Sequence, residues 1–580
     1  MKWFVWVPLL LVCAVVCPAQ LTREQKTSDF LQLAGVYAKN FAPYEWKRET
    51  LKIDLYDLRP WLDRISRSKD DLEFYEICAE YVSRLESAHD VFGLSSTFTA
   101  ELPFSADIYD ERILIDSIER SELPAGDYPF KAGDELVSID GRPAAEIVRD
   151  FGKYSLSSNR RSAGRTAAAL LTFRPQWLMP HAHEVGEKAQ IVVRREGGEL
   201  ETYSIPWIKS GEPITAVGPV PSPRTSGRMA EGGPRLFAAP YSGLAGEPVD
   251  ERIARPYMRP LARLWRQRRP GPPRAVIGEG SLRPVFAAGL PGTWRQRLGR
   301  SSDAFFSGAY ESGGQRIGFL RIPDFDPAST TFALRQFESE ISYFQANTDG
   351  LVVDVMRNPG GNACYAEALV SYLMTGPFQV LGYELRATAL WVYDFAAVLA
   401  LAKEMEAEPW EVDLLSAALE DVQRAYRENR GRTGPLPICG ASLEAGPAAD
   451  FRGRLLAYTK PLLVLADEFS SSAADAFAAM IQDNWRAPVF GMRTMGAGGN
   501  VYEFNGTTYS EGFTSVTISL MHRRNPVAVS GYPATSYIEN VGVRPDIEHD
   551  YMKRENLMEN GRPFVEAFTA AILEQIRNGR

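Results

Sequence analysis

Between residues 316 and 550 the chain alternates short apolar runs with segments of helical periodicity, and this alternation limits the possible folds more than any other feature. The runs GLVVDV, PLLVLAD and APVFGM lack polar alternation, which is typical of strands buried on both faces of a sheet. The segments YAEALVSYLM and AADAFAAMIQDN carry apolar residues at helical spacing. The pattern predicts an α/β core over residues 313–550, followed by a closing helix in residues 551–580.

Two regions with different residue patterns precede this core, and a chain of 580 residues is expected to contain several domains. Residues 20–96 mix charged and apolar positions at three- and four-residue spacing, which predicts an N-terminal helical domain. Residues 97–210 contain short β-like runs separated by Gly, Pro and Asp. Within them, FKAGDELVSIDGRPAAEIVRDF resembles a PDZ domain in its order of turn, strand, hairpin turn and helix. The resemblance implies peptide binding by strand addition, and the alternative is a small β domain that acts as a spacer.

The first residues, MKWFVWVPLLLVCAVVCPAQ, have the features of a secretory signal. Lys2 precedes an apolar run, and the run ends at small residues before Ala19. We therefore expect residues 1–19 to be removed and the mature protein to be secreted or periplasmic, without an integral membrane segment. The run is shorter than the roughly 18 to 20 residues that span hydrocarbon. A membrane anchor, or a lipid on Cys13 or Cys17, is the alternative.

Composition excludes several classes of function. A net charge of −9 argues against nucleic-acid binding. Apart from the signal, the chain has Cys78, Cys364 and Cys439, which allow at most one internal disulfide. No CxxC or HExxH motif occurs, and His181 and His183 supply two imidazoles without a third ligand. We expect neither a metal nor an organic cofactor.

Residues 211–312 depart from the acidic character of the chain. Between residues 251 and 300 there are twelve Arg and two Glu, together with many Pro and Gly. Such a composition does not build a core of its own, so we expect a linker, a docking segment or a removable piece.

The stretch DEFSSSAADAFAAMIQDN places three serines at the start of a predicted helix. A serine hydroxyl there meets unpaired backbone NH groups and the positive end of the helix dipole, which suits a nucleophile. Serine is also a preferred N-cap, and Asp475 stands where a capping box needs an acid. Local features therefore leave both interpretations open.

A glycine turn supplies a second element of a catalytic site. Asn358, Pro359, Gly360 and Gly361 lie between a predicted buried strand and a helix. Paired glycines let backbone NH groups approach a substrate oxygen closely. Together with a serine at a helix start, this turn predicts an oxyanion hole.

Four segments in order, GFLRIPDF, VVDVMRNPGG, LADEFSSSAADAFAAMIQDNWRAPVFGMRTMGAGG and IENVGVRPDI, resemble the S41 family of serine peptidases, the C-terminal processing or tail-specific proteases. The resemblance implies a core of crotonase or ClpP type. In that family the nucleophile lies three residues before an acid, which selects Ser472. The amide of Ala473, with Gly360 or Gly361, would then form the oxyanion hole. Supporting roles would fall to Asp483 and Asn358.

One departure from the family changes the expected base. Most tail-specific proteases place a catalytic Lys in a Gly-Lys-Gly turn, where this chain has Ala497. The Gly-Ala-Gly-Gly form resembles the branch of the chlamydial protease-like activity factor. That branch is similar in using a Ser-His-Glu triad, which implies His89 in LESAHDVFG and Glu539 in SYIENVGVRPDI.

The resemblance implies an exported serine endopeptidase acting on proteins or peptides through Ser472, His89 and Glu539. It also implies a zymogen in which part of residues 215–310 blocks the site until it is cleaved, and a homodimer. One alternative is an inactive peptide- or ligand-binding protein that keeps the fold. Another is a Ser-Lys dyad with Lys460 or Lys403.

Overall fold

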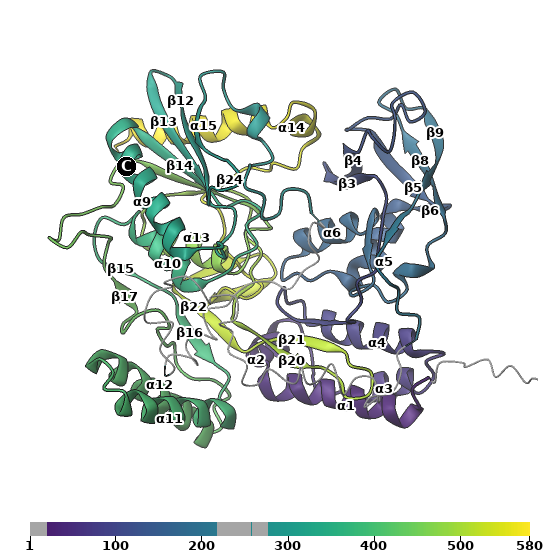
Figure 1. Cartoon of the computed structure of the whole chain (residues 1–580), viewed down its shortest axis with the longest axis horizontal. Helices are drawn as coiled ribbons and strands as arrows, with labels where there is room; N and C mark the ends of the chain where they lie inside the picture. The colour runs from purple at the N-terminus through teal and green to yellow at the C-terminus, as the bar shows by residue number, and fades with distance from the viewer. Residues whose placement is uncertain (1–19, 217–256, 258–275, 580) are drawn as a thin grey trace, which may run out of the picture.

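The protein is a multi-domain α/β molecule whose three parts meet around one centre (Figure 1). A computed structural model describes residues 20–216, residue 257 and residues 276–579. The predicted signal, residues 1–19, lies outside these residues, as does most of the arginine-rich stretch. No helix in the described ranges combines the length and the apolar character needed to cross a membrane.

The N-terminal part is a group of four helices: α1 (Arg23–Asn40), α2 (Tyr44–Thr50), α3 (Arg59–Ile65) and α4 (Asp71–Ser83). Their core is aromatic, with Phe30, Tyr37 and Tyr81 fully buried. A strand from this end of the chain, β1 (Val91–Gly93), joins β21 (Phe513–Thr517) and β20 (Val501–Asn505) in an antiparallel sheet. The N-terminal helices are thus tied to residues more than four hundred positions later in the sequence.

The second part is an antiparallel β domain. Its main sheet has the order β3-β4-β5-β8-β9, with β6 paired to β5. The small sheet β10-β2-β7 and the helices α5 and α6 complete the domain. The elements are β2 (Thr99–Glu101), β3 (Phe104–Tyr109), β4 (Arg112–Ile118), β5 (Glu135–Ile139), β6 (Arg142–Pro143), α5 (Ala144–Phe151), η1 (Gly152–Tyr154), α6 (Arg160–Ala169), β7 (Phe173–Pro175), η2 (Ala182–Glu184), β8 (Lys188–Arg194), β9 (Leu200–Pro206) and β10 (Ile208–Ser210).

The third part is built on a seven-stranded sheet of order β11-β12-β13-β14-β18-β19-β24. The strands from β13 to β24 run parallel, and β11 and β12 are antiparallel additions. The strands are β11 (Arg295–Leu298), β12 (Phe306–Ser312), β13 (Gln315–Arg321), β14 (Gly350–Asp354), β18 (Leu462–Ala466), β19 (Val489–Gly491) and β24 (Ile547–Glu548).

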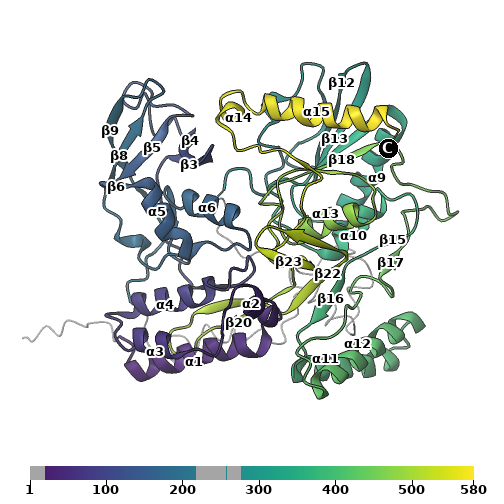
Figure 2. The same cartoon turned by 180° about the vertical axis from the view of Figure 1, so that it is seen from behind.

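Helices cover both faces of this sheet, as Figures 1 and 2 show. One face packs on α9 (Thr330–Asn347), α10 (Ala363–Ser371) and α13 (Ala473–Asp483); Val353 and Val464 point to this side. The other face packs on α15 (Arg562–Arg577), with Val352 and Leu463 on that side. Because successive strand residues face opposite ways, uninterrupted apolar runs are what such a sheet requires.

The remaining elements of the third part are not strands of this sheet. They are η4 (Ala287–Gly289), β15 (Phe378–Gln379), β16 (Gly382–Leu385), α11 (Ala389–Glu404), α12 (Pro409–Arg427), β17 (Glu444–Ala445), β22 (Ser519–Val529), β23 (Tyr532–Tyr537) and α14 (Arg554–Met558). Strands β16, β22 and β23 form one small sheet, and β15 pairs with β17.

The structure differs from the sequence-based boundaries at two places. The sheet begins at Arg295 and not near residue 313, because β11 is an edge strand and can carry exposed arginines. The C-terminal region is not one helix but two. Gly561 has a φ of 82° and separates α14 from α15 in a left-handed conformation that glycine adopts readily.

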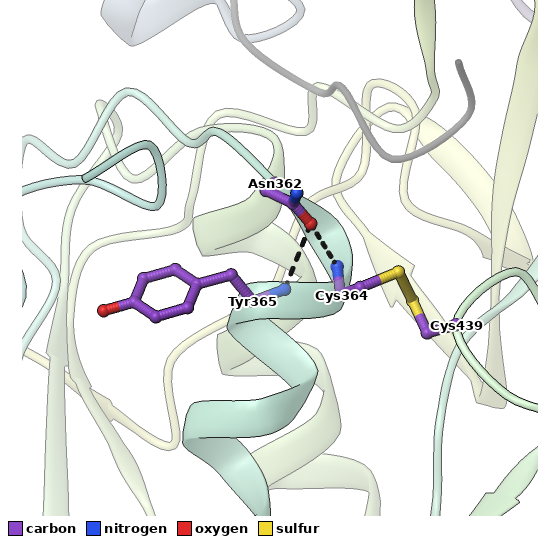
Figure 3. Close-up of a disulfide and its surroundings, with 4 residues drawn as sticks. All are labelled: Asn362, Cys364, Tyr365 and Cys439. Carbon is purple, nitrogen blue, oxygen red and sulfur yellow. Dashed lines mark hydrogen bonds between the residues drawn. A yellow bond between two sulfur atoms is a disulfide. The ribbon is translucent and has the colours of Figure 1, made fainter. Parts of the chain in front are cut away.

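One disulfide joins Cys364 to Cys439, and Cys78 is free and buried. Figure 3 shows Cys364 in the first turn of α10, where the side chain of Asn362 accepts hydrogen bonds from the amides of Cys364 and Tyr365. The bridge spans 75 residues, a loop that contains α11 and α12. The disulfide ties the segment that contains α11 and α12 to α10, the helix that follows Gly360 and Gly361.

We expect reduction of this disulfide to destabilise the protein. Closing a loop of this length contributes about 4 kcal/mol in the chain-entropy model. Urea unfolding with and without reductant measures the difference. The variant Cys364→Ser/Cys439→Ser serves as control, because its stability should not respond to reductant. Equal unfolding curves for the wild-type protein in both conditions would contradict the prediction.

Candidate active site

Ser472 stands at the junction between β18 and α13 with an unusual backbone. It precedes the first residue of α13 and has φ 60° and ψ −112°. A non-glycine residue with positive φ carries strain, and such residues cluster at functional sites. The Ser472 Oγ atom lies 3.0 Å from Nε2 of His89. Both side chains are fully buried, so this hydrogen bond forms away from solvent.

The carboxylate of Asp475 holds the serine in this conformation. Its Oδ2 accepts hydrogen bonds from the amide of Ser472 at 2.7 Å and from that of Ala497 at 3.0 Å. Its Oδ1 accepts from the amide of Gly496 at 3.0 Å and from the hydroxyl of Thr494. Burial raises the pKa of Asp475 to about 6, although these hydrogen bonds lower it. Asp475, which the sequence also allowed as part of a helix cap, thus joins Ser472 to the turn of Gly496, Ala497 and Gly498.

His89 is placed by contacts with two other parts of the chain. It lies between α4 and β1, and its carbonyl oxygen accepts a hydrogen bond of 2.5 Å from the hydroxyl of Ser515 in β21. The amide of the preceding residue, Ala88, donates to Oγ of Ser158 at 2.9 Å. The imidazole therefore reaches Ser472 only when the β1–β21 pairing and the segment before α6 are both in place.

Glu539 lies in the same buried region and is paired with a lysine. Its Oε1 accepts a hydrogen bond of 2.6 Å from Nζ of Lys47, and its Oε2 accepts from the amide of Gly498 at 3.0 Å. Lys47 also donates to Oδ1 of Asn540 at 2.7 Å and to the carbonyl of Glu86 at 2.9 Å. Neither Lys47 nor Glu539 is exposed. The ammonium group of Lys47 compensates the charge of the Glu539 carboxylate, and both groups are buried.

A further acid, Asp90, adjoins the histidine. It accepts hydrogen bonds from the amide and the hydroxyl of Thr517 at 2.9 and 2.8 Å. Burial raises the pKa of Asp90 to about 6, its hydrogen bonds lower it, and the charge of Glu539 adds to the rise. The carboxyl groups of Asp90, Asp475 and Glu539 are thus all buried around Ser472 and His89.

The glycine turn lies directly against the nucleophile. A Cβ atom added at Gly360 would be 2.6 Å from Cβ of Ser472 and 3.0 Å from the amide nitrogen of Ala473. The amide of Gly360, however, donates to Oδ1 of Asn358 at 2.9 Å. In this conformation the amides of Gly361 and Ala473 are the better candidates for an oxyanion hole. Asn358 supports the turn, since its Nδ2 also donates to the carbonyl of Ile322 at 2.9 Å.

Three other residues named from the sequence lie away from this centre. Asp483 ends α13, roughly 15 Å along the helix from Ser472, and its side chain is paired with Arg523. Lys460 precedes β18, whose opposite end leads to the serine, and donates to the carbonyl of Thr348. Lys403 is exposed on α11. The supporting role expected for Asp483 would therefore have to act along the length of α13 and not through contact with Ser472.

The β domain is joined to the nucleophile loop by ion pairs. Arg165 of α6 is buried and donates to Asp107 of β3 at 2.6 Å and to Glu468 at 3.0 Å. Arg161 donates to the same Glu468 oxygen at 2.7 Å. Glu468 lies four residues before the nucleophile. Sequence reasoning missed Arg165, as it missed Lys47 and Asp90, because these side chains meet their partners only through tertiary contacts.

The end of the arginine-rich stretch also reaches the site. Val276 belongs to one small buried cluster with Ala88, Ala169, Phe469, Met495 and Ala497. Within the next four residues the chain passes Arg357: a side-chain nitrogen of Arg357 donates to the carbonyl of Ile277, and the amide of Gly280 donates to the carbonyl of Arg357 at 2.9 Å. Among the described residues no group of three His, Cys, Asp or Glu side chains could hold a metal ion.

We expect Asp90 to make stability depend on pH. The native state binds its proton more tightly than an unfolded chain with an ordinary Asp pKa of 3.8. This contribution is therefore complete below about pH 4 and is lost as the pH rises through about 6, a change of about 3 kcal/mol. Asp90→Asn should remove this part of the pH dependence.

Urea unfolding at several values between pH 4 and 7 measures this effect. Asn can still accept from the Thr517 amide and donate to its hydroxyl, so the variant should fold. Asp63→Asn, at an exposed position, is the matched control and should follow the wild-type profile. Identical profiles for Asp90→Asn and the wild-type protein would contradict the assignment.

Comparisons with known proteins agree with this arrangement. Residues 316–549 match the model of peptidase family S41, and residues 98–215 match that of a PDZ domain. A protein of Chlamydia muridarum, described as uncharacterized, is 24% identical over 96% of this chain and 94% of its own length. A protein of Chlamydia trachomatis serovar D is also 24% identical, over 94% of this chain and 92% of its own length.

Among solved structures, mature CPAF in complex with lactacystin has the same fold. Its TM-score is 0.72 at 20% sequence identity, and the alignment covers 96% of this chain and 99% of that one. A second crystal structure of mature CPAF gives a TM-score of 0.71 at 19% identity, and the alignment covers 96% of this chain and 98% of that one. Residues 316–549 therefore carry a peptidase domain of family S41 behind a PDZ domain, and a serine hydrogen-bonded to a histidine lies at its centre.

Proposed function

We propose that the protein is an exported serine endopeptidase that hydrolyses peptide bonds of protein substrates through Ser472, His89 and Glu539. The observation that carries this proposal is the 3.0 Å contact between Ser472 Oγ and His89 Nε2, two residues 383 positions apart. A serine that serves only as a helix cap has no need of an imidazole. Export and removal of residues 1–19 belong to the proposal on the strength of the N-terminal sequence alone.

The geometry supports nucleophilic catalysis with His89 as base. During attack on the substrate carbonyl, the Ser472 proton passes to Nε2 of His89, which then gives it to the leaving amine. The negative charge that develops on the carbonyl oxygen would be held by the amides of Ala473 and Gly361. Ser472 has a positive φ, and its hydroxyl lies at hydrogen-bonding distance from the histidine.

Glu539 would orient His89 and stabilise its protonated form. A carboxylate near the imidazole favours the positive charge that catalysis creates. The bonds from Lys47 and the Gly498 amide fix that carboxylate in place. We assign Lys47 a positioning role, since its ammonium is bonded to Glu539 and Asn540, and no step of the reaction requires its deprotonation.

Part of residues 211–312 would act as an inhibitory segment that is removed on activation. The described residues of this stretch support the proposal, because Val276 to Gly280 contact the surroundings of both His89 and the glycine turn. A homodimer of the activated enzyme remains a prediction from the family resemblance.

The competing function is peptide binding without catalysis. Replacement of the family's lysine by Ala497 is what favours it. The presence of His89 at hydrogen-bonding distance removes the need for that lysine, so the catalytic proposal has the stronger support.

We expect Ser472→Ala and His89→Ala each to reduce hydrolysis of an unfolded protein by roughly 1,000-fold or more, because both act in the same step. A fluorophosphonate probe should label wild-type Ser472 and not the Ser472→Ala variant. Ser471→Ala is the matched control and should keep activity within about twofold, since the Ser471 hydroxyl makes no hydrogen bond with the described residues. Full activity of Ser472→Ala would disprove the proposal.

Lys47→Met tests the charge pairing of Glu539. Removing one partner of a buried ion pair leaves an uncompensated charge, which costs about 3 kcal/mol or more in the free energy of unfolding. Adding Glu539→Gln should restore much of that stability, because the remaining charge is gone. Activity should stay low in the double variant if the carboxylate itself serves His89. Recovery of activity along with stability would show that Glu539 has a structural role only.

A further inference from the structure

Residues 276–281 run between the two walls of the catalytic centre. At one end, Val276 is 3% exposed in the cluster that contains Ala88, the neighbour of His89. At the other end, Gly280 lies beside Pro359, with 3.7 Å between an added Cβ and Cγ of the proline. Pro359 precedes Gly360, which touches Ser472. A stretch of five residues thus reaches from the histidine side to the glycine turn.

We propose that the enclosure around Val276 is a pocket for a substrate side chain next to the scissile bond, and that it selects a small aliphatic residue. Its walls are Ala88, Ala169, Phe469, Met495 and Ala497. The inference rests on the proposed function, because it concerns the substrate of the same site. It adds the chemical class of residue that the peptidase accepts there.

The backbone of this stretch is turned, since the amide of Glu279 donates to the carbonyl of Val276 and that of Ser281 to the carbonyl of Gly278, each at 3.2 Å. The amide of Gly280 and the carbonyl oxygens of Ile277 and Ser281 are held by Arg357 and Arg321. Such main-chain bonds do not depend on the side chains of the bound segment, whereas a pocket for one side chain does. Val276 is the side chain in this stretch that enters a buried apolar cluster. We therefore expect the enzyme to select the substrate residue that occupies the position of Val276.

The walls of the pocket are small and apolar. Three of the five residues are alanines, and every one of the five is at most 6% exposed. The hydroxyl oxygens of Ser157 and Ser162 lie 3.4 and 3.1 Å from Sδ of Met495, and these contacts restrain the methionine side chain. Removal of Val from water is favourable here. A carboxylate or an ammonium in the same place would be buried among apolar groups, which is costly.

One wall comes from the PDZ domain. Ala169 is the last residue of α6, and the buried ion pairs of Arg165 hold this helix against Glu468. The domain that precedes the peptidase core therefore shapes the site directly. Ala169 can be changed without touching Ser472, His89 or Glu539, which makes it suitable for a test of specificity.

Quenched fluorescent peptides that copy residues 270–283 provide the substrates. They carry Val, Ala, Phe, Lys or Asp at the position of Val276. We expect kcat/KM of the enzyme, prepared as the full chain and assayed after activation, to be highest for Val, and at least roughly 30-fold lower for Lys and Asp, the range that one apolar pocket can supply. Mass spectrometry of the products locates the cleaved bond relative to that position.

Ala169→Met should fill the pocket. Cleavage of the Val peptide should fall at least roughly tenfold, while that of the Ala peptide should change less. Ala163→Met is the matched control, because Ala163 lies on the same helix outside the cluster. Its preference should equal that of the wild-type enzyme.

A binding measurement separates this inference from the proposed function. The variant Ser472→Ala/Val276→Asp lacks the nucleophile and no longer offers its own valine, so labelled peptides can be compared by fluorescence anisotropy. Tighter binding of the Val than of the Asp peptide supports the pocket even if no peptide is hydrolysed, in which case only the catalytic proposal fails. Hydrolysis without preference at this position overturns the pocket and leaves the catalytic proposal intact. No preference in either assay overturns the pocket as well.

Discussion

The carboxylate of Asp475 is the group on which the catalytic centre depends. It accepts hydrogen bonds from the amide of Ser472 and from the amides of Gly496 and Ala497. One side chain therefore joins Ser472 to the segment that precedes Glu539 in the sequence. Burial of a carboxyl group is unfavourable, and four donors offset that cost. The same bonds stabilise the positive φ of Ser472, a conformation that an isolated serine would avoid.

The site exists only where three parts of the chain meet. His89 depends on the pairing of β1 with β21, Glu539 depends on Lys47 of α2, and the nucleophile loop depends on Arg165 of α6. These contacts are buried and charged or polar, so they stabilise only when complete. Loss of one partner leaves a charge or a donor unsatisfied in a dry place. The candidate catalytic centre therefore forms only when the three parts of the chain pack together.

The sequence predicted the α/β core well because parallel strands buried on both faces have an unmistakable apolar pattern. The sequence singled out Ser472 and His89 only through the family resemblance, since local features left both a helix cap and a nucleophile open for the serine. Lys47 was not found, because a lysine on an amphipathic helix is usually solvated and its partner is 492 residues away. The sequence did not show the distance between Ser472 and Asp483 for a related reason: sharing a helix face does not bring the two ends of a helix together.

Burial of the reacting groups has a consequence for substrate access. Ser472, His89 and Glu539 are each 0% exposed, so a polypeptide cannot reach the nucleophile unless something moves. The contacts that cover the site differ in strength. Arg165, Lys47 and Asp475 each bind several groups through a charged side chain, whereas the contacts of residues 276–281 include main-chain hydrogen bonds and the apolar side chain of Val276. A competing peptide can reproduce main-chain bonds and fill a small apolar pocket, but it cannot replace a buried ion pair. The stretch beginning at Val276 is thus the part of the cover that a substrate is equipped to displace.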